Sequence, residues 1–355
     1  MKRSSAATTA AASSGEALGA TMRSCGRRLT TPRGYRPAAP MPDLPVLAYD
    51  AVLDAVPLLD AIARVREAFL AHHRGEWVMP PKVYLEAPPN GDFRAMPARG
   101  GGLALLKWVT SFPANPARGL PVVMGVICLS DAESGEPLML LDARSVTALR
   151  TGAVAAVATQ ALAARDASTV GIVGCGLHGV WTARALAAAG YGPGVCTDPE
   201  EERAFALARE LGWAAGTRED ALGAEIVACV TPGHTPVVEA GDLRPGLHLN
   251  MLGADGPGKA EATPGAVASC ALFCDEWAQA SHGGELTGAV EAGLVTRDQV
   301  TDLGAVLAGE APGRPGPDAV TLFDSTGLAI QDLAVATAAY EAWRAGNAAA
   351  KIVSL

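Results

Sequence analysis

The chain has 355 residues, a net charge of −9, and 49% hydrophobic against 18% charged residues. This length and composition predict a large core, typically in two domains, and exclude wholesale disorder. The acidic balance, without a basic stripe between aromatic residues, argues against nucleic acid as a partner. No apolar run reaches the roughly 18 residues that span a membrane. The seven scattered cysteines, with no second pair at zinc spacing, indicate a reducing, cytoplasmic setting without a metal site.

Residues 1–44 are rich in alanine, serine, threonine, arginine and proline, and Glu16 is the one acidic residue before Asp43. They show neither an amphipathic period nor a long apolar segment, so a secretory signal is excluded. We expect a disordered tail or a start codon placed too far upstream, because the likeness to an organelle transit peptide is superficial.

Regular structure is predicted to begin after this segment. Apolar residues recur at helical spacing over 49–53 and 58–73, which predicts two helices. Between residues 77 and 130, short apolar runs alternate with Pro/Gly turns, which favours an antiparallel sheet. Residues 134–143 read as a further hairpin strand, and residues 145–163 as a long helix of small residues.

Three cations interrupt the strand-like runs: Lys82, Arg94 and Lys107. A cation in a half-buried strand needs a partner or a ligand. The three residues therefore either form a pocket for a carboxylate or point to solvent on a polar face. Arg150 lies early in the long helix, beside Thr151, where the chain is expected to cross between domains.

The most specific motif is VGIVGCGLHG at residues 170–179. The four residues before its first glycine predict a buried strand, and the ten after its last glycine predict a helix. In this G-x-G-x-x-G pattern Gly174 permits a sharp turn, Gly176 lets the backbone approach a pyrophosphate, and Gly179 lets helix and strand pack closely. The anion then binds at the helix N-terminus, so a dinucleotide site is predicted here.

The neighbourhood of this motif favours NAD. Leu177 and His178 complete the glycine-rich turn, and a second strand is predicted at residues 194–197. Asp198 follows that strand, about 20 residues beyond the motif, where a carboxylate contacts the ribose of NAD. No Arg or Lys lies at residues 195–199 to bind the 2′-phosphate of NADP. NAD is therefore the expected cofactor, with NADP as the alternative.

Further strands alternate with helices up to residue 324. Polar residues that follow parallel strands gather at one edge of the sheet, where ligands bind. Thr231 follows one of these strands, and Asp255 follows the next as a candidate acid/base group. Asp324 and Ser325 follow the last strand, and Ser325 or Thr326 is alternatively the N-cap of the last helix. The strands are predicted at 226–230, 247–252, 271–275 and 320–324, and the helices at 200–211 and from 325 to about 344.

Seven motifs, in this order, are similar to those of the ornithine cyclodeaminase/mu-crystallin family. They are PPKVYL (80–85), RAMPA (94–98), KWVTSFPANPARGLP (107–121), ALRTGA (148–153), GCGLHG (174–179), HLNMLGADGPGKAE (248–261) and LFDSTGLAIQD (322–332). The resemblance covers residues 46–352. The pairing of Lys82 with Arg94 most resembles the archaeal-type alanine dehydrogenase branch.

This resemblance implies an α/β fold with two domains and a homodimer. A Rossmann domain with a doubly wound parallel sheet would occupy residues 149–325. An α+β substrate-binding and dimerisation domain would combine residues 45–148 and 326–355. The active site would lie in the cleft between them.

The resemblance also implies the roles of single residues. Lys82, Lys107 and Arg150 would surround the substrate carboxylate and the reacting carbon, with Lys107 catalytic. Asp255 would activate a nucleophile or take a proton. The residues predicted to contact the cofactor, from the motifs and from the resemblance, are Thr151, Gly174, Gly176, Leu177, His178, Gly179, Asp198, Thr231, Asp324 and Ser325.

Arg94 directs the prediction of the substrate. Ornithine cyclodeaminases carry an acidic residue at this position to receive the distal ammonium, which Arg94 would repel. We therefore expect an NAD(P)-dependent oxidoreductase acting on the C–N bond of a small α-amino acid, such as alanine, or of a cyclic imine. Three alternatives stay open: a cyclodeaminase that converts ornithine to proline and ammonia with recycled NAD, a mu-crystallin-like NAD(P)H-dependent binding protein, and a tailoring enzyme for a secondary metabolite.

Overall fold

The structure, a computed structural model, describes residues 42–233, 235–256 and 258–354. Most of the predicted tail, up to residue 41, lies outside the described residues. Strand β1 (Leu44–Leu47) begins within the segment predicted as tail, and Leu44 is buried. The strand therefore starts at the last residue of that segment, and the sequence does not mark it because a four-residue strand shows no clear periodicity.

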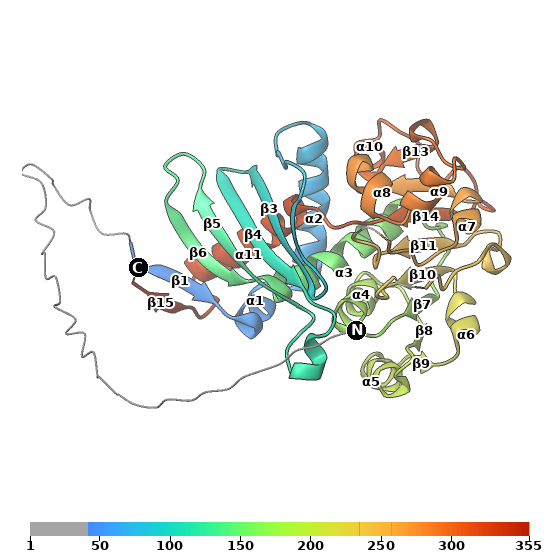
Figure 1. The fold of residues 1–355 in the computed structure, drawn as a ribbon, viewed down its shortest axis with the longest axis horizontal. Coiled ribbons are helices and arrows are strands. Elements are labelled where there is room, and N and C mark those ends of the chain that lie inside the picture. The colour runs from blue at the N-terminus through green and yellow to red at the C-terminus, as the bar shows by residue number, and fades with distance from the viewer. Residues whose placement is uncertain (1–41, 234, 257, 355) are drawn as a thin grey trace, which may run out of the picture. The chain divides into compact units, whose positions relative to one another are not determined.

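Two sheets organise these residues, and Figure 1 shows them side by side. The first has seven strands in the order β15-β1-β6-β5-β4-β3-β2. Strands β2 to β6 form antiparallel pairs, which confirms the sheet predicted for residues 77–143. The strands are β1, β2 (Val83–Ala87), β3 (Gly91–Gly100), β4 (Leu103–Ser111), β5 (Val123–Asp131), β6 (Pro137–Asp142) and β15 (Lys351–Val353).

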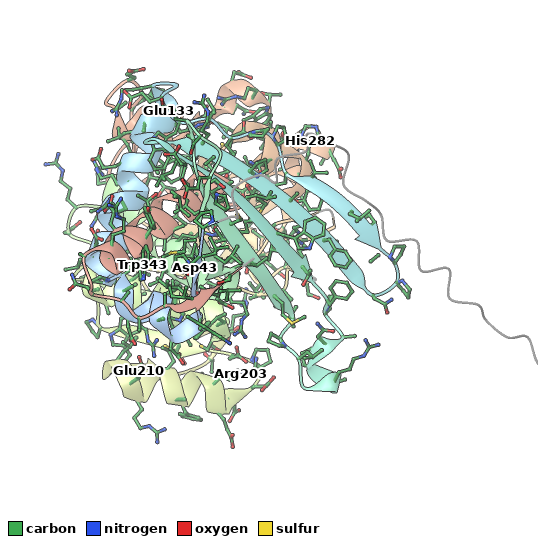
Figure 2. All side chains as sticks on the ribbon, turned by 90° about the vertical axis from the view of Figure 1, so that its left-hand side faces the viewer. Asp43, Glu133, Arg203, Glu210, His282 and Trp343 are labelled. Carbon is green, nitrogen blue, oxygen red and sulfur yellow. The ribbon has the colours of Figure 1, made fainter. Side chains whose placement is uncertain are left out.

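The two ends of the described chain meet in this first sheet. β1 pairs in parallel with β6 and antiparallel with β15. Beside this pairing, Ser354 donates a hydrogen bond of 2.5 Å to Asp43, which is labelled in Figure 2. The C-terminal end of the chain therefore completes a sheet that its N-terminal part begins.

The second sheet has eight parallel strands in the order β13-β12-β14-β11-β10-β7-β8-β9. Its order runs outward from β7 to β9 on one side and from β10 to β11 on the other, where β14 then precedes β12 and β13. This is the doubly wound Rossmann arrangement predicted from the sequence. The edge strands β9 and β13, with two and three residues, were not predicted. The strands are β7 (Val170–Val173), β8 (Gly194–Thr197), β9 (Ala214–Ala215), β10 (Ile226–Cys229), β11 (His248–Met251), β12 (Ala271–Cys274), β13 (Val300–Asp302) and β14 (Thr321–Asp324).

Helices cover both sheets. α1 (Tyr49–Ala55), α2 (Leu58–His73), α3 (Ala143–Leu162) and α11 (Ala329–Arg344) accompany the first sheet, and α11 contacts β3 and β4. The helices of the second sheet are α4 (Leu177–Ala188), α5 (Glu201–Leu211), α6 (Arg218–Leu222), α7 (Pro264–Ala268), α8 (Trp277–Gly283), α9 (Thr287–Glu291) and α10 (Leu303–Leu307). Short 3-10 turns lie at Asn115–Arg118, Ala240–Asp242 and Arg297–Gln299. No helix of the described ranges is long and apolar enough to cross a membrane.

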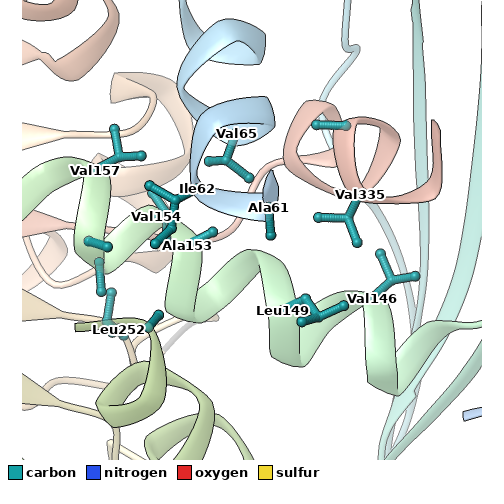
Figure 3. Close-up of a cluster of buried hydrophobic side chains, with 14 of the residues drawn as sticks. Ala61, Ile62, Val65, Val146, Leu149, Ala153, Val154, Val157, Leu252 and Val335 are labelled. Atoms are coloured by element: carbon teal, nitrogen blue, oxygen red, sulfur yellow. The ribbon is translucent and has the colours of Figure 1, made fainter. Parts of the chain in front are cut away.

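Helix α3 joins the two sheets. It packs against α2 and α11 on one side and against α4 and β11 on the other, and Figure 3 shows its Val146, Leu149 and Val154 among buried residues of α2 and α11. A helix that is buried all round needs apolar and small residues on every face. At Gly152, a Cβ atom would lie 2.3 Å from the backbone oxygen of Trp181 on α4. The domain boundary predicted at residue 148 falls inside this helix.

Candidate active site

A cavity of about 50 Å³ lies where the first sheet faces the glycine-rich turn of the second. The structure brings the four predicted cations together in its wall: Lys82, Arg94, Lys107 and Arg150. Arg94 lies on β3, Lys107 on β4 and Arg150 on α3, whereas Lys82 precedes β2 by one residue and is not inside a strand. His178 and Thr326 also line the cavity, so both sheets contribute to it.

Strand geometry explains why two of these cations point the same way. Met96 lies opposite Lys107, and Arg94 lies opposite Val109. Because side chains alternate along a strand, these four residues share one face of the sheet. All four are buried, with Arg94 7% and Lys107 1% exposed. The prediction that the cations share a pocket rather than a solvated face is therefore favoured by their burial.

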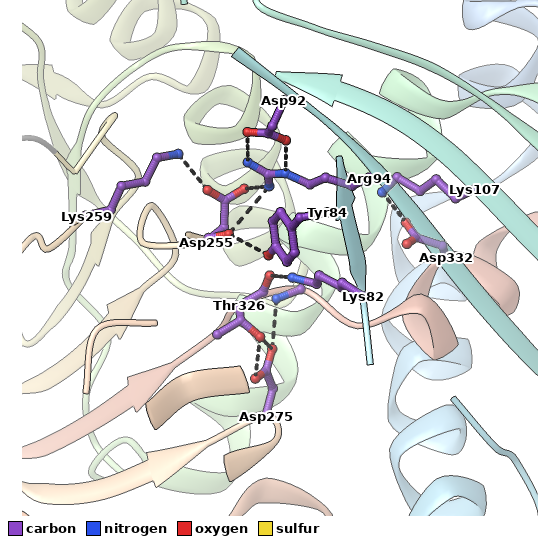
Figure 4. Close-up of polar contacts among 11 residues, drawn as sticks. Lys82, Tyr84, Asp92, Arg94, Lys107, Asp255, Lys259, Asp275, Thr326 and Asp332 are labelled. Carbon is purple, nitrogen blue, oxygen red and sulfur yellow. Dashed lines mark hydrogen bonds and ion pairs between the residues drawn. The ribbon is translucent and has the colours of Figure 1, made fainter. Parts of the chain in front are cut away.

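Arg94 joins the two sides of the cavity through ion pairs. Its Nε donates to Asp92 at 2.6 Å, and its Nη1 donates to Asp255 at 2.6 Å (Figure 4). Lys259 donates to the second oxygen of Asp255, also at 2.6 Å. Burial alone would raise the pKa of Asp255, but Arg94 and Lys259 hold it well below its ordinary value. Asp255 is therefore a carboxylate that stays ionised.

Lys107 has one carboxylate partner in the core. Its Nζ lies 3.0 Å from Asp332 Oδ1 (Figure 4), and Asp332 is fully buried. Arg150 Nε lies 3.5 Å from the same oxygen, and its Nη1 donates to Gln331 at 3.4 Å. Burial lowers the pKa of Lys107 to about 8, although Asp332 opposes the shift. Lys107 can therefore exchange a proton near neutral pH.

Lys82 is held by the chain that follows β14. Its Nζ donates to the backbone oxygen of Thr326 at 2.6 Å. Burial lowers its pKa to about 8. The Thr326 hydroxyl in turn donates to Asp275 at 3.1 Å, and burial raises the pKa of Asp275 to about 6. The Thr326 carbonyl therefore positions the Lys82 ammonium, and Asp275 in turn binds the Thr326 hydroxyl (Figure 4).

The glycine-rich turn has the geometry that a dinucleotide needs. Gly174 has a positive φ of 98°, and Gly179 lies so close to Gly174 that a Cβ atom on it would be 1.9 Å from the Gly174 oxygen. Gly176 is the N-cap of α4 and has no side-chain cap, and a Cβ atom there would meet nothing within 4 Å. The open side at Gly176 fits a pyrophosphate at the helix N-terminus.

Three neighbours of this turn were also predicted to contact the cofactor. Leu177 is exposed at the start of α4. Burial lowers the pKa of His178 to about 4, and Arg150 and Lys107 add to the shift. Asp198 directly follows β8 and accepts a hydrogen bond of 2.7 Å from the backbone amide of Cys175, inside the turn. All three residues therefore lie in or beside the glycine-rich turn.

Three other residues predicted to contact the cofactor form hydrogen bonds within the protein. Thr151 is buried in α3 and its hydroxyl donates to Thr147. The Thr231 hydroxyl accepts from the amide of Gly233. Asp324 is fully buried and accepts from the amide of Leu286 at 3.0 Å. Direct cofactor contact by Thr151 or Asp324 is therefore not favoured by the geometry.

The start of the last helix was predicted wrongly. Ser325 and Thr326 both donate to Asp275, and α11 begins later, after the N-cap residue Leu328. Hydroxyl side chains before a helix resemble an N-cap in sequence, but here the carboxylate on the neighbouring strand end binds them instead.

Sequence reasoning missed four charged residues that pair with or support the predicted site residues. Asp92 lies two residues before Arg94 on the same face of β3, a spacing that was visible in the sequence. Lys259 and Asp332 lie inside two of the family motifs. Asp275 ends a predicted strand but lies outside every motif. No group of three His, Cys, Asp or Glu side chains in the described ranges is placed to hold a metal ion.

The glycine-rich turn and the cationic cavity that faces it fit an oxidoreductase that binds a small acid beside a nicotinamide. The chain belongs to the ornithine cyclodeaminase/mu-crystallin family, whose model matches residues 46–347.

Comparisons with individual proteins agree with this family assignment. Alanine dehydrogenase of Archaeoglobus fulgidus is 39% identical over 314 residues, which cover 86% of this chain and 97% of that protein. An archaeal alanine dehydrogenase dimer with bound NAD has a TM-score of 0.84, with 37% identity, 88% of this chain and 100% of that chain covered. Δ1-pyrroline-2-carboxylate reductase of Thermococcus litoralis, solved with NADH and L-proline, has a TM-score of 0.83 at 27% identity, with 87% and 100% covered. They confirm the predicted family, fold class and enzyme class.

Gly176→Val is expected to weaken NADH binding by about tenfold or more, because the side chain would fill the open side of the turn where the pyrophosphate approaches. The unfolding midpoint should stay close to that of the wild type, since nothing contacts a Cβ atom there. Gly265→Val, at a position equally open but remote from the turn, is the control. The affinity is measured by titration of NADH fluorescence. Unchanged affinity in Gly176→Val would show that the dinucleotide does not bind at this turn.

Proposed function

We propose that the chain catalyses the NAD-dependent, reversible oxidation of a small monocarboxylic α-amino acid to its imine, with alanine or a cyclic imine as the substrate class. The observation that carries this proposal is the weak attachment of Arg150, which lines the cavity. Its polar contacts with Gln331 and Asp332 are long, at 3.4 and 3.5 Å. A guanidinium held this weakly is available for bidentate binding of a carboxylate. The substrate side chain would face the apolar residues Met96, Val109 and Val123.

The ion pairs of Arg94 and Asp255 make ornithine a poor substrate. The guanidinium of Arg94 is balanced by Asp92 and Asp255, which weakens the predicted repulsion of a distal ammonium. However, both carboxylates are already paired, Asp92 with Arg94, and Asp255 with Arg94 and Lys259. A distal ammonium would have to displace a cation from them, so a side chain without charge fits better.

Each residue around the cavity has its own role in the proposed reaction. Bound NAD supplies the hydride acceptor. Arg150 and Lys82 would hold the carboxylate, and Lys107 would take a proton from the substrate amine, because its pKa of about 8 suits acid/base catalysis. Asp255 has a pKa too low for the predicted role as a base. Its permanent charge instead favours stabilisation of the positive charge that develops on the substrate nitrogen.

The experiment that tests this function compares substrates directly. Purified protein with NAD is incubated with alanine, proline or ornithine in separate cuvettes, and absorbance and products are followed. We expect NADH to form with alanine or proline. Proline and ammonia formed from ornithine without net NADH would overturn the proposal in favour of the cyclodeaminase. NADH binding without turnover of any substrate would favour the mu-crystallin-like alternative.

The two directions of the reaction are expected to depend oppositely on pH. Burial lowers the pKa of Lys107 to about 8, so the free amine forms as pH rises through 8. Oxidation, which needs the base, should accelerate through this range, and imine reduction, which needs the acid, should slow. Because the pKa of Lys82 is also about 8, profiles of kcat/KM are measured for Lys82→Met and Lys107→Met. The change of kcat/KM near pH 8 should persist in Lys82→Met. If it is lost in Lys82→Met and persists in Lys107→Met, Lys82 is the residue that transfers the proton.

We also propose that the chain is a homodimer that associates through the outer face of the first sheet. Apolar side chains of β2, β4 and β5 are exposed there: Val83 63%, Leu85 58%, Leu106 46%, Trp108 39% and Val126 42%. Trp108 lies opposite Val126, so they form a continuous surface. Such apolar patches mark interaction sites, and the similar archaeal alanine dehydrogenase was solved as a dimer.

Trp108→Glu is expected to give a folded monomer, because it would bury a carboxylate without a partner at the centre of this surface. Light scattering during gel filtration measures the mass. Phe205→Glu, at an exposed aromatic residue on α5, is the control and should remain a dimer. A dimeric Trp108→Glu protein would exclude this face as the interface.

We further propose a cytoplasmic location. The six cysteines of the described residues are all free, which fits a reducing compartment. Cell fractionation followed by immunodetection tests this assignment, and recovery of the protein from an oxidising compartment would contradict it.

A further inference from the structure

Three buried carboxylates outside the cavity form a connected series: Glu261, Glu285 and Asp324. Each is at most 1% exposed. Burial raises the pKa of Glu261 to about 7 and that of Glu285 to about 8, and the pKa of Asp324 is also raised by burial. The side chains accept mainly from backbone amides in the described part of the chain. Buried carboxylates without cations are unfavourable for folding, so a role in holding those amides would explain them.

Glu261 ties together the loops that follow β10 and β11. One of its oxygens accepts from the amide of Thr231 at 2.6 Å. The other accepts from the amides of Leu252 at 3.1 Å and Gly253 at 2.7 Å. A Cβ atom on Gly253 would lie 2.6 Å from the Glu261 carboxylate, so the contact requires glycine. Asp255 follows this tied segment by two residues.

The next two carboxylates hold the backbone behind Glu261. Glu285 accepts from the amide of Glu261 at 2.9 Å and from the amide of Ala262 at 2.5 Å. Asp324 accepts from the amide of Leu286, the residue after Glu285. Each carboxylate therefore fixes the backbone beside the next, from the end of β14 to the loop that carries Asp255.

We propose that Glu261 and Glu285 are positioning residues for Asp255. Their carboxylates fix the loop after β11 so that Asp255 meets Arg94 and the substrate nitrogen. This inference rests on the proposed function, in which the charge of Asp255 stabilises the transition state. A displacement of about 1 Å at such a group lowers the rate by up to about 100-fold.

The test uses the full chain with Glu261→Gln and Glu285→Gln. Glu225→Gln is the control, because Glu225 also accepts from two backbone amides, those of Ser168 and Thr169. Glu225 is exposed and lies at the opposite end of the strands, just before β10. Hydrogen exchange of residues 249–262 is measured without ligand. The kcat and KM are measured with alanine or proline and NAD, well below the unfolding midpoint of each variant.

We expect faster exchange over 252–256 and a kcat about 10- to 100-fold lower in both variants, with KM within about threefold. The Glu225→Gln control should match the wild type. A lower unfolding midpoint with wild-type kcat and exchange would make the carboxylates merely structural and overturn the proposal. If Glu261→Gln fails to fold, the kcat and the hydrogen exchange of Glu285→Gln test the proposal. If the wild type turns over no substrate, the proposed function fails, and the exchange data alone then support or overturn the positioning.

Discussion

Asp255→Asn is expected to lower kcat by about 10²- to 10³-fold while NADH binds within about threefold of the wild-type affinity. The carboxylate lines the cavity, and Arg94 and Lys259 keep it ionised. Asparagine keeps its shape but removes the negative charge beside the nitrogen on which positive charge develops. Since that charge develops as the neutral amine loses its hydride, the loss should appear in kcat more than in KM. Steady-state kinetics and NADH fluorescence measure the two effects.

Asp92→Asn is the matched control for this prediction. Asp92 also pairs with Arg94, at 2.6 Å, but is not among the residues that line the cavity. Its replacement removes one partner of Arg94 and leaves the charge of Asp255, so a loss below about tenfold is expected. Equal losses in the two variants would mean that Asp255 acts by orienting Arg94. Retained turnover in Asp255→Asn would exclude the carboxylate from the chemistry.

Asp332→Asn is expected to destabilise the protein by about 3–5 kcal/mol, because it leaves Lys107 and Arg150 without their shared buried counter-charge. Lys107→Met should cost less, since the fully buried Asp332 then keeps Arg150, at 3.5 Å, as its counter-charge. The double variant Lys107→Met/Asp332→Asn removes both charges of the closest pair. It should therefore be more stable than the sum of the single losses predicts. Urea unfolding followed by circular dichroism measures the three free energies.

The double-variant cycle also separates stability from catalysis. Both variants that lack Lys107 should be much less active than the wild type whatever their stability, because they lack the side chain proposed to transfer the proton. Arg150 Nε lies 3.5 Å from Asp332 and loses this counter-charge in the double variant, so recovery there is expected to be incomplete. Strict additivity of the two losses would show that Lys107 and Asp332 do not interact, contrary to their 3.0 Å separation.

The order of strands and helices in the second sheet was largely predictable from the sequence. Each parallel strand there is a short apolar run bounded by polar turns, as at residues 226–230 and 271–275. Its glycine-rich turn is local, because the strand, three glycines and helix all lie within 20 residues of one another. The edge strands were missed because two or three residues carry no period. Their strand conformation comes from pairing with a neighbour that the sequence places elsewhere.

The polar partners at the site were much less predictable. Lys107 and Asp332 are 225 positions apart, and Lys82 and Thr326 are 244 positions apart. Nothing in a local pattern links such residues, because their contact depends on how α11 packs on the first sheet. The same limit explains the wrong N-cap at Ser325, whose hydroxyl binds Asp275 on a different strand end.

By itself, the sequence determined the glycine-rich turn, the alternation of strands and helices, the family and the four cations of the cavity. Those features are encoded in residue type and short spacing, which fix backbone conformation and burial locally. The tertiary structure decided which carboxylate faces which cation and therefore the protonation of each group. It assigns a permanent charge to Asp255 and a pKa of about 8 to Lys107. A pKa depends on burial and on charges within a few ångströms, and only packing brings those together.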